Sequence, residues 1–183
     1  MDFSECSGNV VSEVPDNAFW NKFSGNGAIT LSNSTTKIGK QAFAQNSTIT
    51  VSNLTNVTEI GEKAFYQNAT YSGLGDISLD SVTSIGNAAF GNCVIGTLYL
   101  GTSTNITIDE NAFYDSESSW NPNSTKITEL NIGNFTGDVK TPFNKCYRLE
   151  KFVVPDTNTV YYTDSEGLKL YLKSNDSEYM STK

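Results

Sequence analysis

The sequence predicts a mostly β protein built as a solenoid, in which about six coils of roughly 23 residues stack along one axis. Three observations carry this prediction. A motif recurs in register, as "TTKIGKQAFAQN", "VTEIGEKAFYQN" and "VTSIGNAAFGNC". Its phenylalanine returns at spacings typical of a solenoid. The remaining residues are rich in Ser, Thr, Asn and Gly, which suits short strands and turns.

The repeated positions predict what fills the coils. We expect each repeated phenylalanine to stack on the phenylalanine of the next coil. The aligned residues are Phe19, Phe43, Phe65, Phe90, Phe113 and Phe143, of which the last five are assigned to the repeat core. Alanine precedes most of them and leaves room for the adjacent turn. Glycine follows the isoleucine at Gly39, Gly61 and Gly86, where a positive φ or a close backbone approach would require it. An Asn, Cys or Ser three residues after the phenylalanine should form an inward ladder that satisfies turn amides.

Each copy also carries an apolar-polar-apolar triplet, which predicts a short strand with one buried face. The central residues of the triplets should point outward. They are Thr30, Thr50, Ser78, Tyr99, Asn131 and Val153. A second extended piece runs through Val-Thr-x-Ile, and short 3-10 or helical turns should lead into Ala-Phe.

Composition excludes several classes of function. The net charge is -8 and Arg148 is the single arginine, so nucleic acid is not an expected partner. The absence of histidine removes serine-histidine and cysteine-histidine mechanisms and the commonest transition-metal ligand. Cys6, Cys93 and Cys146 have no metal-binding spacing, so no metal or cofactor is expected. Cys93 and Cys146 should be free, buried thiols. No run of 18 apolar residues is present, so no membrane span is expected.

The combination of V-T-x-I-G, A-F and a following Asn or Cys in "SVTSIGNAAFGNC" resembles the BspA-type (Treponema pallidum type) leucine-rich repeats, from about Val11 to about Leu172. The resemblance implies a right-handed, curved solenoid with a concave parallel sheet. It also implies a cell-surface or secreted protein linked to adhesion and host-matrix binding, whose export signal is missing from "MDFSECSGNV". The proline that usually ends the concave strand is matched by Pro15 and Pro155.

The chain divides into three expected parts. Residues 1–27 would form an N-terminal cap with a partial first repeat, 28–156 the solenoid, and 157–183 a C-terminal capping hairpin and tail. The sixth copy, "GDVKTPFNKC", lacks both the isoleucine and the alanine, so we expect a distorted coil there. The tail "YYTDSEGLKLYLKS" resembles the hairpin that often closes such arrays.

A binding surface is predicted where aromatic and polar residues meet on the concave strands. Tyr99 should lie beside Glu129 and Asn131, with Asp76 on the same face; an aromatic flanked by carboxylate and amide groups can bind a sugar or a peptide side chain. Trp120, in the inserted loop 115–126, would add a contact anchor, although it could instead fold back over the core. Trp20 is expected to cap the first coil.

The function that fits best is a non-catalytic, monomeric extracellular module that binds a protein or glycan partner. One alternative is a structural spacer in a longer surface protein. A remote alternative is a glycosidase acting through two carboxylates, such as Asp76 and Asp80, although no recognisable cleft accompanies them.

Overall fold

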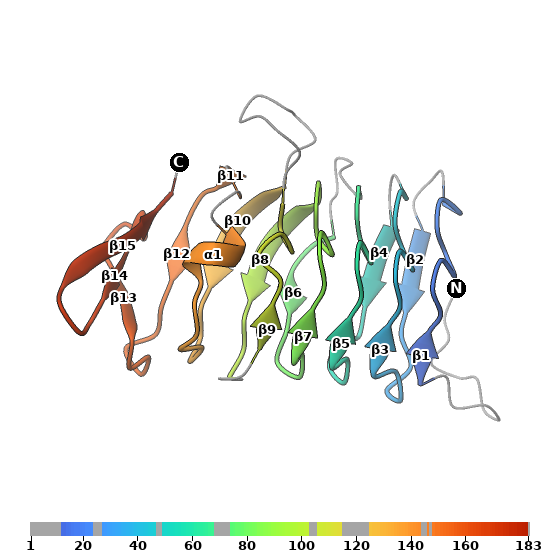
Figure 1. Ribbon diagram of the computed structural model, residues 1–183, viewed down its shortest axis with the longest axis horizontal. Helices are drawn as coiled ribbons and strands as arrows, with labels where there is room; N and C mark the ends of the chain where they lie inside the picture. Colours follow the sequence, from blue (N-terminus) through green and yellow to red (C-terminus); the bar gives the residue numbers. More distant parts are fainter. Residues whose placement is uncertain are drawn as a thin grey trace.

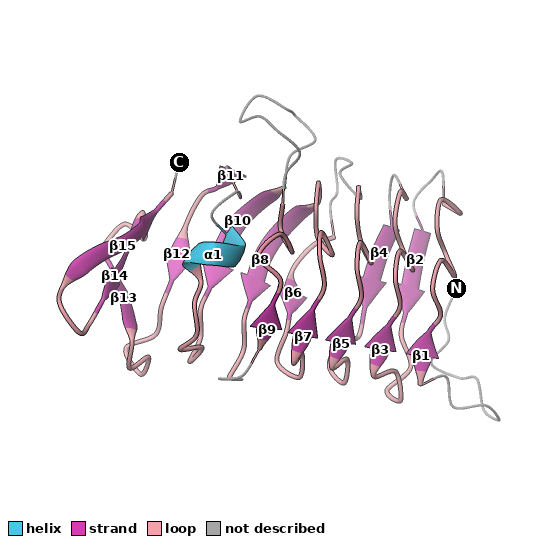
Figure 2. Cartoon of the chain, in the orientation of Figure 1, coloured by secondary structure: helices cyan, strands magenta, loops and turns pink. Residues whose placement is uncertain are grey.

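The computed structural model describes residues 12–23, 27–46, 49–67, 74–102, 106–114, 125–143, 146 and 148–182. Over these residues the chain winds into a parallel β solenoid of about five turns, with a repeat of about 22 residues and almost no helix (Figures 1 and 2). The predicted fold class is confirmed. Each coil has three sides, and each side makes its own contacts with the next coil.

The first side contributes a two-residue strand to a parallel sheet, called here the isoleucine sheet. Its strands in spatial order are β1 (Glu13–Val14), β3 (Lys37–Ile38), β5 (Glu59–Ile60), β7 (Ser84–Ile85) and β9 (Thr107–Ile108). Equivalent residues pair, since Ile38 lies opposite Ile60 and Ile60 opposite Ile85. This register keeps these three isoleucines in the interior, where each is at most 2% exposed.

The second side carries the triplets and is called here the triplet face. Its strands are β2 (Gly27–Thr30), β4 (Ile49–Ser52), β6 (Ile77–Ser78), β8 (Val94–Tyr99), β10 (Lys126–Asn131), β11 (Arg148–Leu149) and β12 (Phe152–Val153). All their pairings are parallel. Strand β2 pairs with β4. Strands β6, β8 and β10 belong to a second sheet, in which β11 and β12 both pair with β10. The triplet face is therefore divided between β4 and β6.

The third side is the turn around each Ala-Phe pair, called here the phenylalanine turn. Alternate amides of this turn donate to carbonyls of the next coil: Gln41 to Glu62 at 2.9 Å, Phe43 to Ala64 at 2.8 Å and Gln45 to Tyr66 at 2.8 Å. The same pattern joins the following coils. Gln41 and Gln45 have positive φ values of 54° and 58°, and their counterparts in neighbouring coils do too. Every second amide of the turn, at Gln41, Phe43 and Gln45, is thus aimed along the solenoid axis, and the two positive-φ residues lie at the ends of this run.

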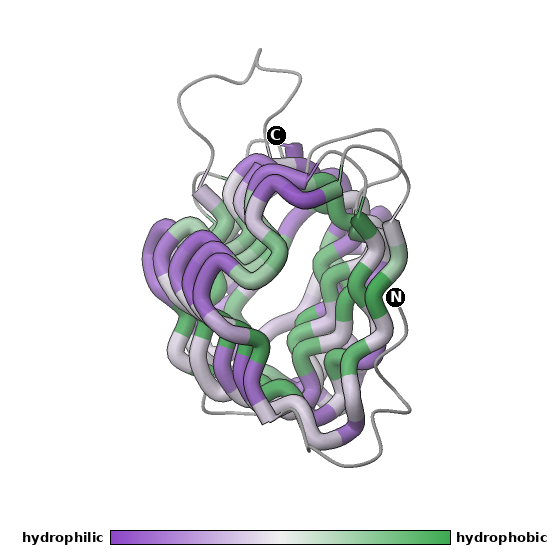
Figure 3. The backbone as a smooth tube through the Cα atoms, turned by 90° about the vertical axis from the view of Figure 1, so that its right-hand side faces the viewer, coloured by the Kyte–Doolittle hydropathy of each residue, from purple (hydrophilic) through white to green (hydrophobic). Residues whose placement is uncertain are grey.

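The phenylalanine rings run through the interior as one stack. From Phe19 to Phe143, successive ring centroids lie 4.5 to 5.4 Å apart. The rings from Phe43 to Phe143 are at most 1% exposed. Viewed along the solenoid axis, equivalent positions of successive coils superimpose and carry similar hydropathy (Figure 3). Burial of these aligned apolar side chains provides the main driving force for stacking the coils.

Asn46, Cys93 and Cys146 occupy the inward position that the sequence predicts for a ladder, whereas its other two members, Asn68 and Ser116, lie outside the described residues. Asn46 is fully buried; its side-chain oxygen accepts from the amides of Lys22 and Phe23 at 2.9 Å, and its Nδ2 donates to the Phe43 carbonyl at 2.7 Å. Cys93 and Cys146 are free and buried, as predicted. The Cys93 thiol donates to the Phe65 carbonyl at 2.9 Å. Cys6 lies outside the described residues.

The glycines that follow the repeated isoleucines, Gly39, Gly61 and Gly86, allow a close approach of the backbone and do not have a positive φ. A Cβ on Gly61 would lie 2.9 Å from the carbonyl carbon of Gly39 and 2.9 Å from the amide nitrogen of Lys40. Any side chain there would press on the backbone of the preceding coil.

Two sequence assignments on the strands are wrong. Thr30 lies opposite Ser52, and Thr50 opposite Ala28, so the outward residue equivalent to Thr30 is Ser52. The triplet Ile49–Thr50–Val51 satisfied the pattern, but the true counterpart ends at Asn53, which has a φ of 65°. Pro15 follows β1 in the isoleucine sheet, because Val14 pairs with Ile38. It therefore does not end a triplet strand.

At the N-terminal end, Trp20 does not take the capping position expected of it. Its side chain is 43% exposed. Phe23 instead packs on Phe19, with ring centroids 6.1 Å apart.

The sixth coil is distorted, as its missing isoleucine and alanine predict. The helix α1 (Lys140–Phe143) replaces the regular turn, and β9 is the last strand of the isoleucine sheet within the described residues. A three-stranded antiparallel sheet follows, made of β13 (Tyr161–Thr163), β14 (Lys169–Leu172) and β15 (Ser177–Ser181).

This terminal sheet is tied to the sixth coil by tyrosines. The Tyr161 hydroxyl donates to the Gly137 carbonyl and the Tyr179 hydroxyl to Asp138 Oδ1, each at 2.7 Å. Burial and the bond to Asp138 raise the pKa of Tyr179. Burial acts to raise the pKa of Asp138, but hydrogen bonds from Thr141 and Tyr179 outweigh it, so the pKa is lowered.

Candidate binding face

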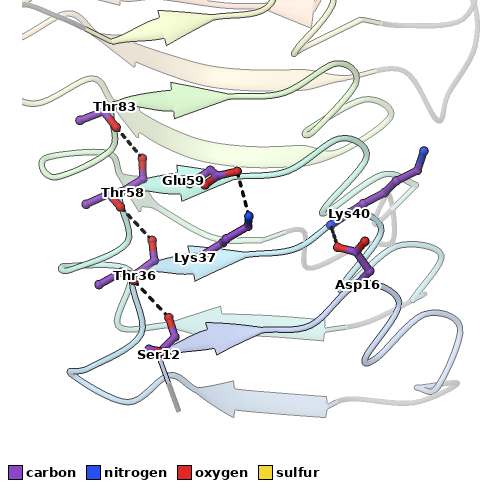
Figure 4. Close-up of polar contacts among 8 residues, drawn as sticks. All are labelled: Ser12, Asp16, Thr36, Lys37, Lys40, Thr58, Glu59 and Thr83. Carbon is purple, nitrogen blue, oxygen red and sulfur yellow. Dashed lines mark hydrogen bonds and ion pairs between the residues drawn. The ribbon is translucent and has the colours of Figure 1, made fainter. Parts of the chain in front are cut away.

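The isoleucine sheet uses its outward polar groups to join coils. The hydroxyl of Thr36 donates to the Ser12 carbonyl at 3.2 Å, Thr58 to Thr36 at 3.0 Å and Thr83 to Thr58 at 3.0 Å (Figure 4). The ion pair between Lys37 and Glu59, at 3.3 Å, bridges the neighbouring strands β3 and β5. These contacts give the outward side of this sheet a structural role.

On the triplet face, Tyr99 lies at the centre of a row of outward residues. It ends β8, with Ser78 of β6 opposite it on one side and Asn131 of β10 on the other. Its ring is half-buried against Gly133, where an added Cβ would lie 3.3 Å from Tyr99 Cε2. Within the described residues the Tyr99 hydroxyl has no hydrogen-bond partner. Asn131 is more constrained, because its Oδ1 accepts the amide of Gly133 at 3.0 Å.

A second row runs beside the first and carries the acids. Thr97 of β8 pairs with Glu129 of β10. On its other side, the Thr97 amide donates to Asp76 Oδ1 at 2.7 Å. Glu129 is half-buried and makes an ion pair with Lys151 at 3.9 Å. The structure thus brings Tyr99, Asn131, Asp76 and Glu129 onto one face, over the three neighbouring strands β6, β8 and β10.

Trp120 lies outside the described residues, so its part in this face stays a prediction. The described residues contain no group of three or more His, Cys, Asp or Glu side chains placed to hold a metal ion. None of the described helical structure is long and apolar enough to cross a membrane.

The inserted residues 70–75 depart from the repeat period in the sequence, and the last two of them, Leu74 and Gly75, line a hollow on the same face. A cavity of about 340 Å³ lies between β4 and β6, where the triplet face is divided. Its lining includes Val51 and Leu54 on one side and Leu74, Asp76 and Asp80 on the other. The available signal was the spacing: Asn46 and Ser52 are six residues apart, as are Cys93 and Tyr99, but Asn68 and Ser78 are ten apart.

A parallel solenoid of stacked, similar coils defines a repeat protein. A sequence profile described as the BspA type Leucine rich repeat region matches residues 8–119 and 76–165, with six copies. Since these ranges cover most of the chain, the protein belongs to the BspA-type leucine-rich repeat family. Such proteins are typically surface-associated binding modules and are generally non-catalytic. Comparison with curated proteins and with solved structures gave no significant match.

Proposed function

We propose that this protein is an extracellular, non-catalytic binding module that recognises a protein or glycan partner through the triplet face around Tyr99. Membership of a family of surface-associated binding modules supports the general role. The proposed location rests on the half-buried Tyr99 ring, which lies between Ser78 and Asn131 on the neighbouring strands and beside the row that contains Asp76 and Glu129. A ring held on one side offers apolar area at little entropic cost, and its hydroxyl remains available for a partner.

Charge favours partners with basic or neutral surfaces. Residues 1–139 contain 5 lysines and 14 acids, a net charge of -9, whereas residues 140–183 carry a net charge of +1. A field of this sign attracts cationic surfaces and lowers affinity for acidic ones. The partner is expected to engage a monomer, with the sheet β13–β15 serving as a C-terminal cap.

The test is an array of matrix proteins and glycans probed with labelled parent protein and with Tyr99→Ala. Tyr171→Ala is the matched control, because Tyr171 is also a half-buried tyrosine but stacks on Tyr162 in the terminal sheet, outside the triplet face. We expect specific binding by the parent and the control, and at least a tenfold loss in Tyr99→Ala. Equal binding by all three would place the contact elsewhere. No binding by folded parent would favour the spacer function.

A further inference from the structure

The division between β4 and β6 is local, because the same two coils are joined on their other sides. In the isoleucine sheet Glu59 pairs with Ser84. In the phenylalanine turn the Phe65 amide donates to the Ala89 carbonyl at 2.8 Å, and the rings of Phe65 and Phe90 lie 5.2 Å apart. On the triplet face, however, β4 pairs with β2 and β6 with β8, and within the described residues nothing pairs β4 with β6. Figure 1 shows β4 and β6 standing apart while β2 lies beside β4. We call this opening the β4–β6 slot.

The backbone groups that face the slot follow from the register. The Ser52 carbonyl accepts the Leu31 amide at 3.1 Å, so Ser52 faces β2 and the backbone groups of the preceding strand residue, Val51, face the slot. The Leu79 amide donates to the Tyr99 carbonyl at 2.9 Å, so Leu79 faces β8 and Ser78 faces the slot. Two parallel strand edges therefore point toward each other across the cavity. Strand edges of this kind are templates for another strand.

The slot has an apolar floor, a closed end and acidic surroundings. Leu54 and Leu74 line it and are buried. Beyond its end, the Ser81 hydroxyl donates to the Thr55 carbonyl and links the two coils again. Asp76 and Asp80 are exposed at its edge, where Asp80 Oδ2 accepts the Ser78 hydroxyl at 2.6 Å, and the described residues of its lining include no lysine or arginine. Its volume of about 340 Å³ is that of a small ligand site.

We propose that the β4–β6 slot binds one extended segment of a partner polypeptide, which adds as a strand between β4 and β6. The segment would direct small apolar side chains toward Leu54 and Leu74 and a lysine or arginine toward Asp76 and Asp80. This inference rests on the proposed binding function and names the class of partner. A peptide fits better than a sugar because only a backbone presents alternating donors and acceptors to both edges at once.

The decisive probe is a pool of capped, fluorescein-labelled octapeptides that alternate valine with lysine or threonine, measured by fluorescence anisotropy with the full chain. The strongest binder is then compared with the same peptide N-methylated at alternate residues, which removes the amide donors to one edge. It is also compared with a version carrying glutamate in place of lysine. We expect saturable binding that falls at least tenfold on N-methylation and at least fivefold on charge reversal.

Protein variants separate the slot from general electrostatics. The double variant Asp76→Asn, Asp80→Asn should weaken the lysine peptide at least fivefold. Glu110→Gln is the control, because Glu110 is an exposed acid in the turn after β9, away from the slot. It should leave binding unchanged. Absence of any saturable binder in the pool, or equal binding of the N-methylated peptide, would overturn the proposal. Partner binding in the array that is lost in Tyr99→Ala would leave the proposed function standing even then.

Discussion

Replacing Phe90 by alanine perturbs the interior ring stack near the middle of its length, between Phe65 and Phe113. Phe90 is fully buried, and its ring lies 5.2 Å from that of Phe65 and 5.3 Å from that of Phe113. Burial of a phenylalanine side chain contributes about 1.5–3 kcal/mol. The cavity left by truncation adds to this loss, because neighbouring coils held by hydrogen bonds on other sides cannot collapse into it. The total for a buried Phe→Ala change is about 3–5 kcal/mol.

The assay is urea unfolding followed by far-ultraviolet circular dichroism. With a slope of about 2 kcal/mol per molar urea, the midpoint of Phe90→Ala should fall by about 1.5–2.5 M. Phe19→Ala is the matched control, since Phe19 is partly buried at the end of the stack. Its loss should be about 1–2 kcal/mol. Because coils are stabilised by their neighbours, faster amide exchange should extend to the coils of Phe65 and Phe113. A Phe90→Ala midpoint equal to that of the parent, or to that of Phe19→Ala, would refute the continuous stack.

Three further perturbations test the contacts between coils. Asn46→Ala leaves buried amides and carbonyls without partners and should lower the free energy of unfolding in urea by about 2–3 kcal/mol. Asn56→Ala is its control: it removes an exposed hydrogen bond to the Asn33 carbonyl and should lower the free energy of unfolding by less than about 1 kcal/mol. Gly61→Ala places a Cβ against the backbone of the preceding coil and should cost about 1–3 kcal/mol by the same assay; an unchanged midpoint would show that the coils can separate there. The lowered pKa of Asp138 means that its contribution is present above its unfolded pKa and is lost as pH falls through the folded value. The urea midpoint should therefore decrease as the pH is lowered below about 4, and Asp138→Asn should make the midpoint less dependent on pH. An unaltered pH profile in this variant would argue against the bond between Asp138 and Tyr179.

The sequence was sufficient for the fold because the repeated positions obey strict steric demands. A phenylalanine every coil can stack only if the coils are parallel and in register, and the Ala before it and the Gly four residues before it mark where backbones touch. The buried Asn46 and the free thiols of Cys93 and Cys146 followed from the same alignment.

The triplet strands were harder to predict because alternation alone does not fix register. Ile49 and Val51 are both buried, so a shift by two residues satisfies the same pattern. The register of β2 against β4, together with the bond from the Leu31 amide to the Ser52 carbonyl, identifies the true neighbour. The separation of β4 from β6 was also hard to predict. The spacing between Asn68 and Ser78 shows four extra residues in this coil, but it does not reveal on which side the two coils separate.

Amide hydrogen exchange at the two edges of the β4–β6 slot tests most directly whether this binding module presents an open strand site. Leu31 and Leu79 donate paired amides and serve as internal references. We predict that the amides of Val51 and Ser78 exchange at least about tenfold faster than these references in the free protein. They should become protected when the selected octapeptide is added. Exchange at Val51 and Ser78 as slow as at Leu31 and Leu79 in the free protein, or no change with saturating peptide, would show that the slot is not an open strand site.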